Sequence, residues 1–344
     1  MTDRQRLLGR TGVSVSSLCL GAMMFGPWGN DDEAESVRII HRALDAGINF
    51  VDTADVYSGG ESERIVGKAL TGRRDNVVLA TKFFLPMGAN PNMGGASRRW
   101  IIRSVEDSLR RLGTDYIDLY QMHRPSTTTD LEETLGVLTD LIRQGKVRYI
   151  GTSSFAASQV VEAQWISRDR HLERFVTEQP PYSILVRGIE GDVLPTASRH
   201  GMGILTYAPL SGGWLSGRWR KNSESGPTPT SAFRPAARFD MSTEANQRKL
   251  DAVEQLAALA EASDMTLIEM SLAFVLNHPS VTSAIIGPRT MEQLESQLPA
   301  AQVRLSDELL DSIDAIVAPG VTINPDDNSY GEHELALSAR RRSH

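Results

Sequence analysis

Short apolar runs alternate with longer amphipathic stretches along most of the chain. Each run has four or five residues that are apolar enough for a strand buried on both faces, the pattern typical of a parallel sheet covered by helices. Eight runs are predicted to be strands: residues 17–20, 49–52, 77–81, 117–121, 147–151, 175–179, 203–207 and 283–286.

The stretches between these runs have helical spacing. In residues 130–144 leucines recur every three or four positions, Asp130 stands where an N-cap is expected and Gly145 follows the last turn. Further helices are predicted at residues 32–46, 61–70, 97–112, 158–168, 192–200, 245–263, 266–277 and 291–298. Strands that alternate with helices in this way predict an α/β protein, a closed (β/α)8 TIM barrel rather than an open doubly wound sheet.

Two segments break the alternation. Residues 211–241, after the seventh strand, are rich in Gly, Ser, Pro and Arg and have no periodicity; a binding loop or lid and a disordered insertion fit this long loop equally well. Residues 306–317 predict an appended helix, and the polar tail after it either folds over the barrel or stays loose. We expect one barrel domain, residues 1–320, and a C-terminal tail, residues 321–344.

Composition and charge narrow the function classes. The chain has 344 residues, 40% of them hydrophobic and 23% charged, which is ordinary for a globular protein. A net charge of −7 argues against a nucleic-acid partner, since such proteins carry a basic face. The sole cysteine, Cys19, excludes an intrachain disulfide and a thiolate-rich metal site, so no metal is expected.

No run of about 18 apolar residues is present, and the first ten residues lack the apolar core of a secretion signal. These features predict a soluble cytoplasmic protein without a membrane partner. They do not indicate an oligomeric state.

Four polar residues stand at or just beyond the ends of three consecutive predicted strands. Asp52 ends the second strand, and Tyr57 lies in the loop that follows it; Lys82 and His123 end the next two strands. Active sites of (β/α)8 barrels lie at the C-terminal ends of the strands, so these side chains are expected to meet. Asp52 should keep Lys82 charged, and Lys82 should lower the pKa of Tyr57 from about 10, making Tyr57 a general acid or base. His123 can donate a hydrogen bond to a substrate carbonyl.

The common nucleotide loops, G-x-G-x-x-G and G-x-x-x-x-G-K-[ST], are absent. The glycine-rich residues 210–217 follow the seventh strand instead, and residues 287–290 follow the eighth and lead into a helix. Loops after strands seven and eight form the recurring phosphate site of these barrels. We therefore expect a nucleotide at these two loops.

Four segments, "INFVDTADVYSGGESERIVGKAL", "VLATK", "RLGTDYIDLYQMHRP" and "IRQGKVRYIGTSSF", resemble the aldo-keto reductase superfamily, and the resemblance runs from about Leu7 to Pro319. It is strongest to the bacterial branch related to potassium-channel β-subunits and NDP-sugar reductases. The resemblance implies NADP(H)-dependent reduction of an aldehyde or ketone by hydride transfer from nicotinamide C4. Tyr57 is then the proton donor, tuned by Asp52 and Lys82, and His123 orients the carbonyl.

The resemblance also implies a set of cofactor contacts. Ser153 and Gln179 match the positions that bind the nicotinamide carboxamide, and Tyr207 matches the aromatic residue that stacks on the ring. Ser154 stands where relatives usually carry asparagine. The complete set comprises Gly21, Ala22, Met23, Asp52, Ser153, Ser154, Gln179, Tyr207, Ala208, Pro209, Leu210, Ser211, Gly213, Leu215, Gly217, Gly287, Arg289, Gln293 and Gln297.

At the adenosine end, Arg289 matches the basic position that faces the 2′-phosphate. Gln293 and Gln297 match the polar positions beside the adenine, where relatives usually have asparagine in place of Gln297. A guanidinium pairs well with a phosphate dianion, so Arg289 favours NADP(H) over NAD(H).

The substrate itself is left open. Aromatic and basic loop residues suggest a pocket for a sizeable, partly apolar or ring-shaped carbonyl compound. The residues expected to line it are Trp28, Tyr57, Phe83, Phe84, His123, Arg124, Trp214 and Trp219. Two other functions compete with carbonyl reduction: a slowly turning regulatory subunit that senses redox state by holding NADPH, and a Schiff-base aldolase built on Lys82.

Overall fold

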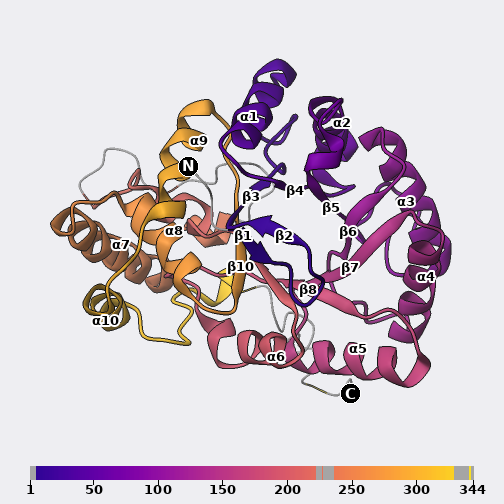
Figure 1. Ribbon diagram of the computed structural model, residues 1–344. Helices are drawn as coiled ribbons and strands as arrows, with labels where there is room; N and C mark the ends of the chain where they lie inside the picture. Colours follow the sequence, from indigo (N-terminus) through magenta and orange to yellow (C-terminus); the bar gives the residue numbers. More distant parts are fainter. Residues whose placement is uncertain (1–4, 222–226, 228–235, 329–340, 342–344) are drawn as a thin grey trace.

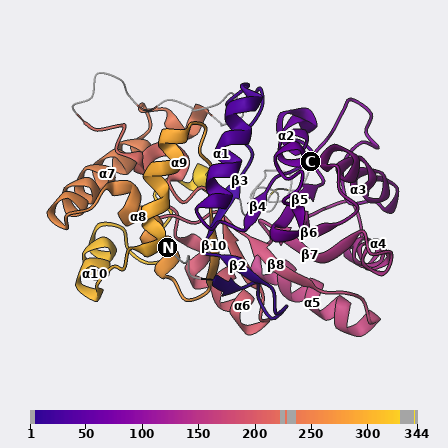
Figure 2. The ribbon, with the colours of Figure 1, turned by 45° about the horizontal axis from the view of Figure 1, so that its top comes forward.

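The computed structural model describes residues 5–221, 227, 236–328 and 341. Eight parallel strands close into a barrel in the order β10-β3-β4-β5-β6-β7-β8-β9, and helices surround it (Figures 1 and 2). The predicted (β/α)8 barrel is confirmed. Its strands are β3 Leu18–Gly21, β4 Phe50–Asp52, β5 Val78–Phe83, β6 Ile117–Met122, β7 Val147–Ser153, β8 Phe175–Gln179, β9 Gly203–Thr206 and β10 Val281–Ile286.

The predicted helices are confirmed to within a few residues. They are α1 Glu33–Asp45, α2 Glu61–Ala69, α3 Arg98–Leu112, α4 Leu131–Arg143, α5 Ala157–Arg170, α6 Val193–Arg199, α7 Glu244–Ala262, α8 Leu267–Asn277, α9 Met291–Gln297 and α10 Asp307–Ile316. In α4 the leucine face is buried against the barrel. Asp130 occupies the N-cap position of α4 but makes no capping hydrogen bond, so the expected capping role of its side chain is wrong.

A two-stranded antiparallel hairpin, β1 Gln5–Leu7 and β2 Ser14–Ser16, lies across the N-terminal end of the barrel (Figure 1). The guanidinium of Arg6 donates to the carbonyl oxygens of Val281 at 2.7 Å and Leu276 at 2.8 Å. Leu8 and Val15 are fully buried in a cluster with the inward-facing strand residues. The hairpin therefore closes this end of the barrel with apolar side chains, and the other end carries the polar groups. The sequence pattern missed the hairpin because three-residue strands are too short to show a period.

Helix α10 packs against α7, outside the ring of barrel helices (Figure 1). Arg187 fixes it by donating to Asp314 and to the Val317 carbonyl oxygen, both at 2.6 Å. The chain then returns to the loop that follows β8, where Thr322 bridges to Val186. Residues 321–328 thus contact this loop and helix α7. The rest of the predicted tail, apart from residue 341, and most of residues 222–235 are outside the described residues.

No helix among the described residues is both long enough and apolar enough to cross a membrane.

Candidate active site

Lys82 lies at the centre of a buried polar cluster at the C-terminal ends of the strands. It is completely buried, and its ammonium donates to Asp52 Oδ2, to the Thr53 carbonyl oxygen at 2.9 Å and to Tyr57 Oη at 3.3 Å. Burial alone would lower the pKa of Lys82, but the charge of Asp52 and the hydrogen bonds to Asp52 and Tyr57 raise it above its usual value. The ammonium therefore stays charged, and its three donors point to three fixed partners.

Tyr57 begins a short 3₁₀ turn, residues Tyr57–Gly60, directly after the loop from β4. Its side chain is only 7% exposed. Burial raises the pKa of Tyr57, and the opposing charge of Lys82 does not outweigh burial. The expectation that Lys82 brings this pKa below its usual value is thus wrong for the protein alone. The phenol is consequently protonated at neutral pH, the state that a proton donor needs.

His123 follows β6, and its backbone N–H donates to the Phe83 carbonyl oxygen at 3.0 Å. The imidazole meets the Tyr57 ring edge-on, with 5.8 Å between the ring centroids. Burial, and after it the charges of Lys82 and Arg124, hold the pKa of His123 well below its usual value. The ring is therefore neutral, with one nitrogen able to donate and the other to accept. Its buried Nδ1 has no hydrogen-bond partner among the described residues.

Two glutamines hold the second oxygen of Asp52. Gln121 on β6 and Gln179 at the end of β8 donate from Nε2 to Asp52 Oδ1 at 2.9 and 3.0 Å, and Gln179 Nε2 also donates to Gln121 Oε1 at 3.0 Å. A carboxylate only accepts hydrogen bonds, so both amide nitrogens must face Asp52. Sequence reasoning missed Gln121. One signal could have found it. Side chains alternate between the two faces of a strand, so Leu119, Gln121 and His123 project from the same face along β6 and its end.

Beside this cluster, residues from four strand ends, those of β6, β7, β8 and β9, form the rim of the barrel mouth. Ser153 Oγ donates to the Gln179 carbonyl oxygen at 2.9 Å, and Ser154 Oγ lies 3.1 Å from Tyr207 Oη. Arg124 Nη1 donates to the His123 carbonyl oxygen at 2.8 Å and to Ser154 Oγ at 3.1 Å. The structure thus brings the residues expected at the nicotinamide end into one connected group.

The glycine-rich loop after β9 winds tightly. Gly212 and Gly213 have φ values of 72° and 106°, which residues with a side chain rarely adopt. A small hollow at the mouth is lined by this loop, including Tyr207, Ala208 and Ser211. The remaining expected loop positions form the same winding segment: Pro209, Leu210, Leu215 and Gly217. The loop is held by its own backbone: the N–H of Ser211 donates to the Ala208 carbonyl oxygen, and those of Gly213 and Leu215 donate to the Leu210 carbonyl oxygen.

A third group of expected residues lies where the chain passes from β10 into α9. The Arg289 N–H donates to Gln293 Oε1 at 2.9 Å, and Asn30 Nδ2 donates to the Arg289 carbonyl oxygen at 2.7 Å. Gln297 is buried, and its Oε1 has no hydrogen-bond partner among the described residues. Gly287 precedes this turn, and Gly21 ends the neighbouring strand β3, with Ala22 and Met23 directly after it.

Three aromatic residues expected to line the substrate pocket are buried elsewhere. Because Lys82 points into the barrel, Phe83 points outward and packs on Tyr120, with 4.8 Å between ring centroids. Trp214 and Trp219 are completely or almost completely buried and pack together with Phe239. The expectation that these three residues wall the pocket is therefore wrong.

The other expected pocket residues do lie at or near the mouth. The Trp28 ring lies 6.1 Å from the Tyr57 ring, measured between centroids, and Arg124 is joined to the rim. Trp28, Phe84 and Arg124 are each partly exposed, so they remain accessible to a ligand.

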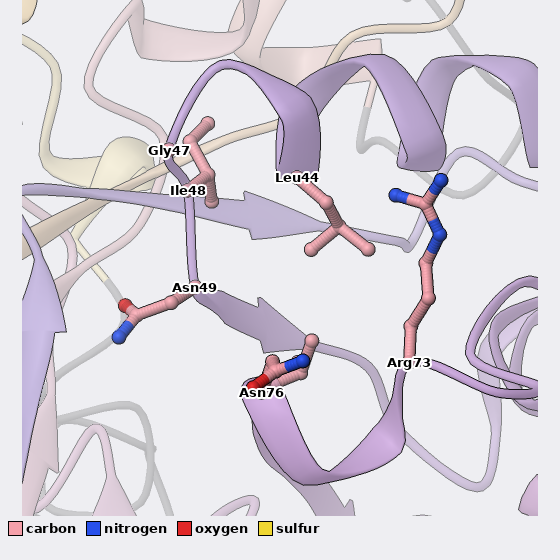
Figure 3. Close-up of a pocket in the computed structure, with 7 residues that line it drawn as sticks. Leu44, Gly47, Ile48, Asn49, Arg73 and Asn76 are labelled. Carbon is pink, nitrogen blue, oxygen red and sulfur yellow. The ribbon is translucent and has the colours of Figure 1, made fainter. Parts of the chain in front are cut away.

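A larger hollow of about 420 Å³ lies at the opposite end of the barrel, beside the starts of β4 and β5 (Figure 3). Leu44, Ile48 and Val77 make it largely apolar, and the one charged residue that lines it, Arg73, pairs with Asp45 at 2.7 Å. Its lining residues include no acid, nucleophile or imidazole. The chemistry therefore lies at the other end, around Lys82.

Comparison with known proteins identifies the family of the chain. Residues 17–318 match the model of the Aldo/keto reductase family. The chain is 40% identical over 326 residues to the uncharacterized oxidoreductase YrpG of Bacillus subtilis, covering 91% of this chain and 96% of that protein. It is 37% identical to the aldo-keto reductase YhdN of Bacillus subtilis, over 83% of this chain and 85% of the relative.

A third relative is the putative voltage-gated potassium channel subunit beta of Schizosaccharomyces pombe, at 35% identity over 91% of this chain and 92% of that protein. The family match spans nearly the whole barrel, from the residue before β3 to the end of α10. The chain therefore belongs to the aldo/keto reductase family, a family of oxidoreductases that act on small carbonyl compounds with a nicotinamide cofactor.

Proposed function

We propose that the protein reduces an aldehyde or ketone to the alcohol with NADPH. The observation that carries this proposal is the set of contacts at Lys82. A buried, charged ammonium contacts both a carboxylate and a protonated phenol, and a neutral imidazole lies against the same phenol. This arrangement supplies a proton and a hydrogen-bond donor at one point, which is what a carbonyl oxygen needs when negative charge develops on it.

Each residue then has a defined task. Tyr57 donates its phenolic proton to the carbonyl oxygen, and Lys82 stabilises the phenolate that remains. Asp52 keeps Lys82 charged and in place, and the neutral ring of His123 donates a hydrogen bond that orients the carbonyl. NADPH, when bound at the mouth, would supply the hydride for the carbonyl carbon from C4 of its nicotinamide. The reverse reaction uses the same groups with the proton returning to Tyr57.

The residues at the mouth fit such a cofactor. Because the side-chain nitrogen of Gln179 faces Asp52, its side-chain oxygen, Oε1, is left to accept a hydrogen bond from a carboxamide. Tyr207 is partly exposed beside it. The winding loop at Gly212 and Gly213 fits a pyrophosphate. Near α9, the unpaired Gln297 Oε1 suits an adenine amino group. We place these residues, with Ser153 and Ser154 at the nicotinamide end, as the cofactor site.

We infer a preference for NADP(H) over NAD(H) from Arg289, because a guanidinium pairs with the 2′-phosphate that only NADP(H) carries. Arg289→Gln should weaken NADPH binding about tenfold or more and leave NADH binding almost unchanged. Fluorescence titration with both cofactors measures this. An equal loss for both would assign Arg289 a general structural role.

The central test is Tyr57→Phe, which removes one oxygen and keeps the ring. We expect kcat/KM for carbonyl reduction to fall at least about 100-fold while the Kd for NADPH changes little, since general acid catalysis contributes about 10²–10⁴. Turnover is followed by NADPH consumption with aldehydes, quinones, ketones and keto-sugars. Tyr116→Phe, the same change at the opposite end of the barrel, is the matched control. Near-normal reduction by Tyr57→Phe would refute the assignment.

The channel-subunit names among the relatives support a second candidate, a slowly turning subunit that holds NADPH and reports redox state. Single-turnover oxidation with retained cofactor would favour it. Rapid multiple turnover, which we expect, would exclude it. Because the chain has one cysteine, and that cysteine is buried and unpaired, we infer that the enzyme works in the reducing cytoplasm.

A further inference from the structure

Arg124 is a fixed cation at the rim of the barrel mouth. Its Nη1 is held by the His123 carbonyl oxygen at 2.8 Å and by Ser154 Oγ at 3.1 Å, and Ser154 Oγ lies in turn 3.1 Å from Tyr207 Oη. These contacts hold the guanidinium between the end of β6, where His123 orients the carbonyl, and the residues placed at the nicotinamide. The head group is therefore not a freely moving surface charge.

No carboxylate of the described residues lies within 4.0 Å of the Arg124 guanidinium. Two other cations near the mouth differ in this respect. Lys82 pairs with Asp52, and Arg238 Nε lies 3.9 Å from Asp327 Oδ1. The charge of Arg124 also acts on the site, because it contributes to the lowered pKa of His123 and opposes the raised pKa of Tyr57. Its positive charge is thus close to the reacting groups and has no carboxylate partner among the described residues.

Holding a partly buried guanidinium without a counter-ion costs side-chain entropy and desolvation that two hydrogen bonds to neutral oxygens repay only in part. Such a cost is offset when a ligand brings the missing negative charge. Both described hydrogen bonds use Nη1, so the edge formed by Nε and Nη2 is the part of the fork that remains for a ligand. Two parallel N–H donors on one edge match the two oxygens of a carboxylate.

We propose that Arg124 binds a carboxylate on the substrate, so that the preferred substrates are aldehydes or ketones that also carry an acid group. This inference rests on the proposed carbonyl reduction, and it adds the substrate class that the sequence left open. A single guanidinium matches the single negative charge of a carboxylate. The acid group would bind at the rim while His123 and Tyr57 hold the carbonyl below it.

The test compares 4-carboxybenzaldehyde with its methyl ester, which keeps the aldehyde and the ring but removes the charge. For the unaltered protein we expect kcat/KM to be about tenfold higher for the acid. Arg124→Gln should lower kcat/KM for the acid by about 10- to 100-fold, the range of one charge-assisted bidentate contact, and change the value for the ester less than about threefold. Arg124→Lys should recover part of the difference, because it restores the charge but not the fork.

Arg148→Gln, the same substitution at the start of β7, is the matched control and should leave both substrates unaffected. Equal losses for acid and ester in Arg124→Gln would show that Arg124 only supports His123, and unchanged values for both would also overturn the inference. Calorimetric titration of benzoate into the NADP⁺-bound protein tests the carboxylate site at Arg124 separately from the proposed carbonyl reduction. Benzoate binding that depends on Arg124, without aldehyde turnover, would refute the reductase assignment alone. Turnover without such binding would refute the carboxylate site alone.

Discussion

Asp55 lies in the loop that carries Tyr57, and it is an acid held in its neutral form. Its side chain is completely buried, Ser104 Oγ donates to Oδ2 at 3.0 Å, and Oδ1 has no partner among the described residues. Burial, and after it the charge of Glu63, raise the pKa of Asp55 from 3.8 to about 8. Arg111 is the nearby cation, and it is already paired with Glu63 at 2.6 Å.

This shift makes a quantitative prediction for stability. Between the unfolded value of 3.8 and the folded value of about 8, the folded state holds one more proton than the unfolded state. The free energy of unfolding therefore falls as pH rises, by about 1.4 kcal/mol per pH unit from this group alone. The stabilisation that neutral Asp55 contributes is complete below the pKa of the unfolded state, 3.8, and is lost as the pH rises through the pKa of the folded state, about 8. Over two pH units inside this window the loss is about 3 kcal/mol.

Asp55→Asn keeps the shape of the neutral acid and removes its titration. Urea unfolding followed by tryptophan fluorescence at pH 5.5, 6.5 and 7.5 measures the difference in unfolding free energy between the variant and the unaltered protein. We expect the variant to gain about 1.4 kcal/mol of unfolding free energy relative to the unaltered protein for each pH unit, because all other titrating groups are the same in the two proteins and their effects cancel.

The matched control is Asp45→Asn at an exposed acid. The hydrogen bond from Arg73 lowers the pKa of Asp45, so this carboxylate is ionised in the folded and unfolded states from pH 5.5 to 7.5. The effect of Asp45→Asn on the unfolding free energy should therefore not change with pH. A flat difference for Asp55→Asn as well would refute the reasoning, since it would mean that Asp55 is ionised in the folded protein.

Three further predictions follow from single contacts. Gln121→Leu removes a hydrogen bond to the charged Asp52, worth about 1.5–3 kcal/mol, so kcat should fall about tenfold or more; an unchanged kcat would show that Asp52 is positioned without Gln121. Asp327→Ala leaves the buried ammonium of Lys249 without its carboxylate partner at 2.6 Å, and the free energy of unfolding should drop by about 3–5 kcal/mol, a loss that an unshifted urea midpoint would contradict. Cys19 is buried and its thiol pKa is raised by burial, so iodoacetamide at pH 8 should label it only in urea, and rapid labelling of the folded protein would argue against its burial.

Most of the fold was predictable because it rests on local patterns. Apolar runs and helical spacing located the eight barrel strands and the helices around them, including α10. The hairpin β1–β2 escaped because its strands are too short to show a period, and it is defined by long-range contacts such as those of Arg6 with Leu276 and Val281. The capping role expected for Asp130 was wrong, since residue type indicates only that a cap is possible and not that the side chain turns toward the helix.

The sequence by itself determined which residues reach the barrel mouth. Strand ends follow from the alternation of elements, and a closed parallel barrel brings the ends of neighbouring strands together, so Asp52, Lys82 and His123 had to lie close to one another. Only the tertiary structure decided their chemical states and partners. Burial and charge at a side chain sum over residues far apart in the chain, and that sum keeps Tyr57 protonated. The same long-range packing buries Trp214 away from the mouth and joins Asp52 to the two glutamines.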